Sequence, residues 1–98
     1  MTPSIGRIVH YNVPLVGWRP MMITGVHGPH EATDGSMNPQ FISGWAKLSP
    51  EDCDDDGLMG ELSRQLEIVS PLVRNEIPVH RSYEGVEPGN WRWPPKED

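Results

Sequence analysis

The architecture follows from one stretch near the start of the chain, Ser4-Ile5-Gly6-Arg7-Ile8-Val9-His10-Tyr11-Asn12-Val13, which is rich in β-branched and aromatic residues and ends at a proline. This composition is typical of a β-strand, because branched and aromatic side chains pack well on a pleated surface. Alternation along the strand puts Val9 and Tyr11 on one face. Ile8 and His10 then lie on the other face.

The rest of the chain predicts further short strands. Met21–His27 follows a turn and an Arg-Pro pair, and we expect it to form a hairpin with the first strand. The remaining strand candidates are Phe41–Leu48, Gln65–Val69, Leu72–Asn75 and Glu76–Arg81. Helical spacing of Leu62, Leu66 and Val69 competes with the strand at Gln65–Val69, and we favour the strand.

Two stretches indicate turns and a helix start. Residues 28–40 are expected to form loops, because glycine, proline, asparagine and aspartate are frequent there. Ser49-Pro50-Glu51-Asp52 predicts a short helix, with serine as its cap and proline in its first position. The acidic run and Gly57 should end this helix within a turn or two. The fold class is therefore mostly β: a small bent antiparallel sheet or SH3-sized barrel with at most one short helix.

Length and composition restrict the class of protein. The 98 residues allow one domain, 1–98, with a variable loop-rich insertion at about 28–64 and an aromatic C-terminal tail. With 10 glycines and 11 prolines, long helices are not expected. We expect no membrane span and no secretory signal. Cys53 is the only cysteine, which fits a reducing cytoplasm.

The charges argue against binding long nucleic acids. The net charge is −6, and residues 51–61 carry six acidic residues and no basic residue. Such binding needs a basic surface, which the sequence does not provide. Six of the eight basic residues are arginines, whose planar guanidinium suits specific contacts with phosphate or carboxylate. Surface salt bridges are the alternative interpretation of these arginines.

The sequence gives little indication of metal binding or catalysis. Asp52-Cys53-Asp54-Asp55-Asp56-Gly57 resembles the start of a calcium loop, but Ser63 occupies the position of the closing glutamate. His27 and His30 could approach a zinc ion together with Cys53 and His80, yet nothing fixes their spacing. Acidic neighbours should also raise the pKa of the Cys53 thiol. We therefore expect no metal site, no cofactor and no enzymatic activity.

The aromatic residues are more informative, because four tryptophans are many for this length. Trp91 and Trp93 alternate around Arg92, so an extended backbone puts both rings on one side and the arginine on the other. The rings could close the core of a small barrel. They could equally offer a stacking surface to a planar base or a partner.

Three motifs carry a resemblance: Gly6-Arg7-Ile8-Val9-His10-Tyr11, Arg19-Pro20, and Pro88-Gly89-Asn90-Trp91-Arg92-Trp93-Pro94. The chain resembles a family of short tailed-phage proteins that open with Gly-Arg-Ile-Val-His-Tyr and close with Pro-Gly-Thr-Trp-His-Trp-Pro. The resemblance covers about residues 1–25 and 74–98. Asparagine and arginine replace the threonine and histidine of the closing motif, and residues 28–64 have no counterpart.

The family resemblance extends to the anti-CBASS sponges, phage immune-evasion proteins that sequester cyclic-dinucleotide signals without cleaving them. It implies a homo-oligomer in the cytoplasm of an infected bacterial cell. A modest core with four tryptophans leaves apolar surface to cover, which predicts a dimer or tetramer. Aromatic rings would stack on the bases and arginines would hold the phosphates. The residues expected to hold the ligand are Arg7, His10, Tyr11, Arg19, Trp91, Arg92 and Trp93. The alternative is a phage structural or host-protein-interaction module without a small-molecule ligand.

Overall fold

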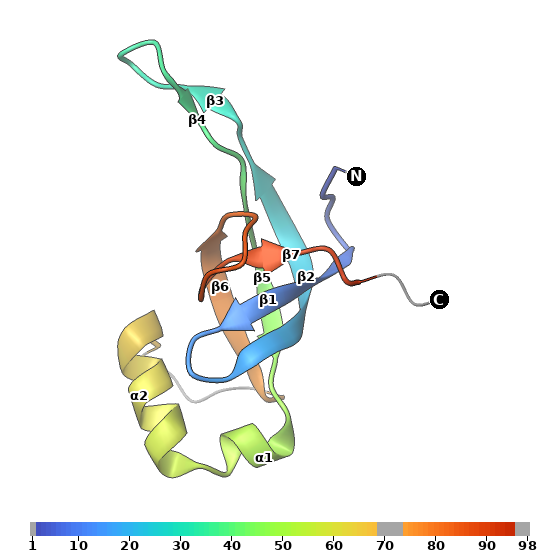
Figure 1. Cartoon of the computed structure of the whole chain (residues 1–98), viewed down its shortest axis with the longest axis vertical. Coiled ribbons are helices and arrows are strands. Elements are labelled where there is room, and N and C mark those ends of the chain that lie inside the picture. Colours follow the sequence, from blue (N-terminus) through green and yellow to red (C-terminus); the bar gives the residue numbers. More distant parts are fainter. Residues whose placement is uncertain (1, 69–73, 96–98) are drawn as a thin grey trace.

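A five-stranded antiparallel sheet forms the body of the protein in the computed structural model, which describes residues 2–68 and 74–95 (Figure 1). The order across the sheet is β6-β5-β2-β1-β7. The strands are β1 (Ile8–Val13), β2 (Gly17–His27), β5 (Phe41–Lys47), β6 (Glu76–Ser82) and β7 (Trp91–Arg92). This confirms the mostly β fold class that the sequence predicts.

The first two strands form the predicted hairpin. Val13 pairs with Gly17, and the pairing continues to Ile8 opposite Met22. Gly17 opens β2 with a φ of 108°, a conformation that favours glycine. The second strand therefore begins four residues before the predicted Met21, because the turn is tighter than the loop expected from the sequence.

The outer strand β7 is hydrogen-bonded on both of its sides. On one side β7 pairs with β1, where Tyr11 lies opposite Trp91. On the other side, Trp91 N–H donates to the carbonyl oxygen of Tyr83 at 3.1 Å, and Gly85 N–H donates to that of Trp91 at 2.9 Å. The segment after β6 thus reaches β7, and the sheet bends round on itself. The aromatic tail expected from the sequence therefore supplies the strand that joins the edges.

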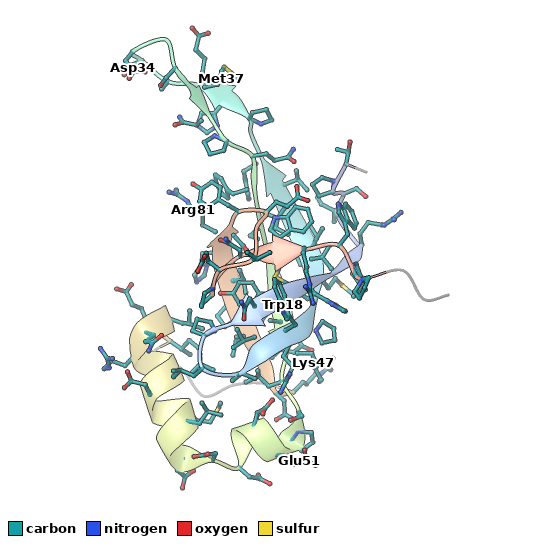
Figure 2. The ribbon with its side chains drawn as sticks, viewed as in Figure 1. Trp18, Asp34, Met37, Lys47, Glu51 and Arg81 are labelled. Atoms are coloured by element: carbon teal, nitrogen blue, oxygen red, sulfur yellow. The ribbon has the colours of Figure 1, made fainter. Side chains whose placement is uncertain are left out.

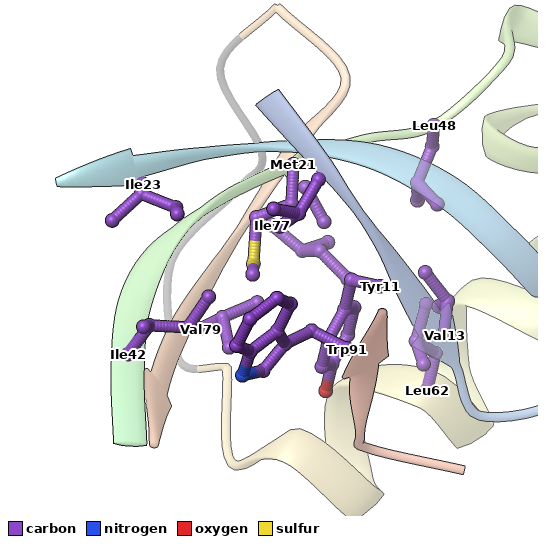
Figure 3. Close-up of a cluster of buried hydrophobic side chains, with 12 residues drawn as sticks. Tyr11, Val13, Met21, Ile23, Ile42, Leu48, Leu62, Ile77, Val79 and Trp91 are labelled. Carbon is purple, nitrogen blue, oxygen red and sulfur yellow. The ribbon is translucent and has the colours of Figure 1, made fainter. Parts of the chain in front are cut away.

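The core lies on the concave side of this sheet (Figure 3). The alternation predicted for β1 is confirmed, because Val9 and Tyr11 are buried while Ile8 is exposed. The buried apolar residues are Val9, Tyr11, Val13, Met21, Ile23, Ile42, Ala46, Leu48, Leu62, Ile77, Val79 and Trp91. All strands of the sheet contribute, and Leu48 and Leu62 from outside the sheet complete the cluster.

Among the described residues two helices follow β5, so the expectation of at most one short helix is wrong. Helix α1 (Pro50–Cys53) begins as predicted, with the Ser49 hydroxyl accepting from Asp52 N–H at 3.2 Å. A second helix, α2 (Asp56–Leu66), starts where the acidic run was expected to end the first. Its N-cap is Asp55, whose carboxylate accepts from Leu58 N–H at 3.0 Å.

The strand predicted at Gln65–Val69 is also wrong for the described residues, since Gln65 and Leu66 belong to α2 and Val69 lies outside the described part. The helical spacing prevails because Leu62 is fully buried against the sheet, with Leu66 packed beside it. This contact, together with the capping aspartate, outweighs the helix-weakening effect of two glycines. In the part of the chain that the structure describes, neither helix is long and apolar enough to span a membrane.

Residues 28–40 form an arm rather than simple loops. Within it, β3 (His30–Glu31) pairs with β4 (Met37–Asn38), and the Asp34 carboxylate accepts from Ser36 N–H at 3.0 Å in the turn. The arm extends away from the sheet, with Asp34 and Met37 near its far end (Figures 1 and 2). The expected insertion at 28–64 also contains β5, which lies between β2 and β6 in the sheet. That stretch is thus largely part of the fold rather than a loop-rich addition.

Candidate functional site

Two of the seven predicted ligand residues belong to the core. Tyr11 is 3% exposed and Trp91 is 2% exposed, so neither offers an aromatic face to a ligand. Burial raises the pKa of the Tyr11 hydroxyl. Trp91 packs edge-on against Trp93, with ring centres 5.4 Å apart. The sequence left two interpretations of Trp91 open, a core residue or a stacking surface. In the structure its ring lies in the core.

Arg19 is engaged by a carboxylate. Its Nε donates to Asp52 Oδ2 at 3.1 Å, and its Nη1 donates to the carbonyl oxygen of Trp18 at 3.0 Å. This contact connects β2 to α1. The hydrogen bond from Arg19 is the main reason why the pKa of Asp52 lies below its ordinary value. Arg19 therefore forms a salt bridge, which was the alternative interpretation of the arginines.

Arg7 and Trp93 lie together at the start of β1. The guanidinium carbon of Arg7 is 5.7 Å from the Trp93 ring centre, within the range of a cation–π contact. Arg7 is exposed and Trp93 is half-buried beside the core. The two tail tryptophans contact each other, as the alternation predicts, whereas Arg92 points to the outer face.

On the outer face Arg92 forms a second cation–π contact. Its guanidinium carbon lies 4.0 Å from the ring centre of Trp18, and His10 is opposite Arg92 in the β1–β7 register. His10 Nδ1 and Arg92 Nε are buried and have no hydrogen-bond partner among the described residues. We call Trp18, Arg92 and His10 the arginine cluster. Six of the seven predicted residues therefore divide between the core, an ion pair and two separate cation–π contacts, and His10 lies opposite Arg92. The structure does not bring the seven together in one place.

The outer face also carries an apolar row that the sequence did not predict. Ile8 lies opposite Met22, Met22 opposite Trp45, and Trp45 opposite Pro78. Ile8 and Trp45 are each 46% exposed, and Met22 is 49% exposed. We call these four residues the apolar row. A signal was present in the adjacent pair Met21-Met22, because alternation forces one of two neighbouring apolar residues outward.

A mixed row runs beside the apolar row, two residues further along each strand. His10 pairs with Pro20, and Lys47 pairs with Glu76, whose carboxylate lies 4.0 Å from the lysine nitrogen. We call His10, Pro20, Lys47 and Glu76 the mixed row. The pairing of β2 with β5 ends at Met21, because Pro20 has no N–H to donate.

A depression of about 240 Å³ opens where this pairing ends. Its lining residues are Ile8, Pro20, Met21, Met22, Trp45, Lys47 and Glu76. The lining joins the apolar row to the mixed row. A side chain from another molecule could therefore enter beside Trp45 and make apolar contacts over most of its surface.

A second depression, of about 210 Å³, lies between β6 and the end of α2. Its lining residues are Tyr11, Gln65, Leu66, Glu67, Pro78, Val79, His80 and Arg81. Only Tyr11 of the seven predicted residues lines it. The mixed polar lining does not resemble a stacking site for a base.

The sequence candidates for metal binding have other partners. His27 stacks on Phe41 with ring centres 4.8 Å apart, and His30 Nε2 lies 3.1 Å from the Asn38 amide nitrogen. Within residues 2–68 and 74–95, no three His, Cys, Asp or Glu side chains form a group that could hold a metal ion. The pKa of the Cys53 thiol is raised, first by burial and then by Asp52 and Asp54, in the predicted direction.

Comparison with known proteins finds no family, no curated protein and no solved structure that matches this chain. The resemblance to tailed-phage proteins therefore stays a prediction.

Proposed function

We propose that this protein is a non-catalytic interaction module that works by contact between its outer sheet face and a protein surface. The observation that carries the proposal is the apolar row, which extends across four strands and borders a depression of about 240 Å³. Contiguous exposed apolar surface of this kind marks interaction sites on soluble proteins. This is the structural or interaction class that the sequence left open.

The composition of the row supports a protein partner. Tryptophan and methionine are enriched in the centres of protein interfaces, where they fill pockets and exclude water. Neighbouring strands are about 4.8 Å apart, so a row across four strands is roughly 14 Å wide. Charged groups lie beside the row rather than within it, which is the arrangement of an apolar centre with a polar rim.

Sequestration of a cyclic dinucleotide is the second candidate function, and the arginine cluster favours it. The guanidinium carbon of Arg92 lies 4.0 Å from the ring centre of Trp18, and its Nε and the His10 Nδ1 lack partners among the described residues. A guanidinium is a common phosphate ligand, and an aromatic face nearby could stack on a base. The other cation–π contact, between Arg7 and Trp93, is on the opposite side of β1. Enclosing a whole ligand would therefore require a second subunit.

Site-specific photo-crosslinking tests the first candidate. A photoreactive amino acid at position 45 should give adducts of defined mass in cells that produce the protein, whereas the same group at exposed Asp54 should not. Equal adducts from both positions, or none from position 45, would reject the interaction surface.

Isothermal titration with a panel of cyclic dinucleotides tests the second candidate. Sequestration requires saturable binding that Arg92→Gln weakens, and the recovered nucleotide should be intact. Absence of binding across the panel would remove this candidate and leave the first unaffected.

A further inference from the structure

We propose that the partner of the outer face is the same face of a second copy of this chain, arranged about a two-fold axis that runs parallel to the strands between β2 and β5. This inference rests on the proposed function and identifies the partner of that surface. It is argued from the sheet register, which fixes the position of each outward side chain relative to its neighbours.

The axis divides the outer face into halves of two strands each. When two sheets face each other, rotation about an axis parallel to the strands leaves each residue at the same height along the strand direction. It places each half of one sheet opposite the other half of the second sheet. Strand β1 then faces β6 of the second copy, and β2 faces β5. An isologous dimer of this type is the commonest symmetric assembly, and each contact between unlike residues occurs twice.

The rotation brings complementary apolar side chains together. Met22 faces Trp45 of the second copy, and Ile8 faces Pro78, because these residues share one level in the register. A methionine sulfur against an indole ring is a favourable contact, and the flexible side chain adapts to the depression beside Trp45. With a crossing angle of about 30° between stacked sheets, the two central pairs make the closest contacts, because they lie next to the axis.

The same rotation makes the charges complementary. Glu76 faces His10 of the second copy and lies next to its Arg92, while Lys47 faces the uncharged Pro20. Among the described residues, Glu76 makes a 4.0 Å ion pair with Lys47, and the Arg92 guanidinium contacts the ring of Trp18 but no carboxylate. A carboxylate placed beside this guanidinium would give it an acceptor in a partly desolvated position.

Another two-fold axis does not reproduce this match. An axis perpendicular to the strands, along the apolar row, puts Trp45 against Trp45 and Ile8 against Ile8. It also moves Glu76 away from His10 and Arg92. Charge complementarity therefore selects the axis parallel to the strands, since wrongly placed charges oppose association.

Sedimentation equilibrium from 1 to 100 µM provides the test. The expected result for the parent is a species of twice the 11.0 kDa chain mass. Met22→Lys should yield monomers with an unchanged circular dichroism spectrum, because Met22 points away from the core. The matched control is Met37→Lys on the arm, where Met37 is 62% exposed, and this variant should remain dimeric.

Charge reversal tests the orientation. Glu76→Arg and Arg92→Glu should each weaken the dimer about tenfold, and the double variant should recover most of the affinity. A monomeric parent at 100 µM, a dimer that survives Met22→Lys, or a double variant no better than the single ones would each overturn the inference. If position 45 then crosslinks to a different protein, the proposed function holds while the second copy is rejected as partner.

Discussion

The guanidinium carbon of Arg92 lies 4.0 Å from the ring centre of Trp18, so the side chains of β7 and β2 meet across the intervening strand β1. The contact connects the strand that joins the sheet edges to the first hairpin. It is made on the outer face, while Trp91 next in sequence enters the core. The two residues of β7 thus hold this strand in place from both faces of the sheet: Trp91 packs in the core and Arg92 contacts Trp18 on the outer face.

The energy of this contact can be measured by a double-mutant cycle. Trp18→Ala and Arg92→Ala should show a coupling of about 0.5–2 kcal/mol in the free energy of unfolding, the range for a partly desolvated cation–π pair. Urea denaturation in the Met22→Lys background excludes any contribution from self-association. Additive effects of the two substitutions would show that the contact does not stabilise the fold.

Trp91→Ala should be strongly destabilising, because the ring is 2% exposed and lies among core side chains (Figure 3). Truncation of a buried aromatic ring costs about 3–5 kcal/mol. Trp45→Ala is the matched control, and in the same monomeric background it should change stability by about 0.5 kcal/mol or less. Equal losses from the two variants would contradict the assignment of Trp91 to the core and Trp45 to the surface.

The Arg19–Asp52 contact predicts a pH dependence. Since the folded-state pKa of Asp52 lies below its unfolded value, the carboxylate stabilises the fold above the unfolded pKa, and this contribution is lost as the pH falls through the folded one. Asp52→Asn should cost about 1–2 kcal/mol at pH 7 through the weakened ion pair and helix cap.

The difference between Asp52→Asn and the parent should shrink below about pH 4. Thermal unfolding from pH 7 to 3 measures it, with Asp54→Asn as the control for removal of an exposed acid on the same segment. Stability curves that stay parallel over this range would show that the ionised carboxylate is not the stabilising group.

Two glycine substitutions should have opposite effects. A Cβ at Gly44 would overlap the carbonyl oxygen of Met22 on the neighbouring strand, whereas a Cβ at Gly60 meets no atom within 4 Å. Gly44→Ala should therefore lower stability by about 1–3 kcal/mol. Gly60→Ala should raise it by about 0.5–1 kcal/mol, since alanine favours the helix interior. Chemical denaturation checks both, and a stable Gly44→Ala variant would contradict the close approach of β2 and β5.

Local sequence signals predicted much of the fold but not α2. Alternation and β-branched residues located four of the five sheet strands, and Ser49-Pro50 located the start of α1. Helix α2 was not predicted, because two glycines and a run of acidic residues disfavour a helix there. Its stability depends on the packing of Leu62 against distant strands. A contact of that kind has no local signature.

The candidate site was less predictable, because it depends on register. Alternation gives the face on which Ile8, Met22 and Trp45 lie, but not that the three are neighbours on separate strands. The same limit applies to Arg19, whose acidic partner Asp52 lies on α1 beyond β5. The tryptophan-rich tail was identifiable from sequence, and its division between core and outer face follows from alternation.

The position of β7 next to β1 affects how the protein is made in a cell. A ribosome completes β1 early and β7 last among the strands of the sheet, so the edge of β1 has no partner during most of translation. Unpaired strand edges bind other strands readily. The nascent chain therefore exposes a pairing edge until the codons for Trp91 and Arg92 have been read and these residues have left the exit tunnel. Ribosome pausing before those codons would prolong the interval in which chaperones, or a neighbouring nascent chain, can bind β1.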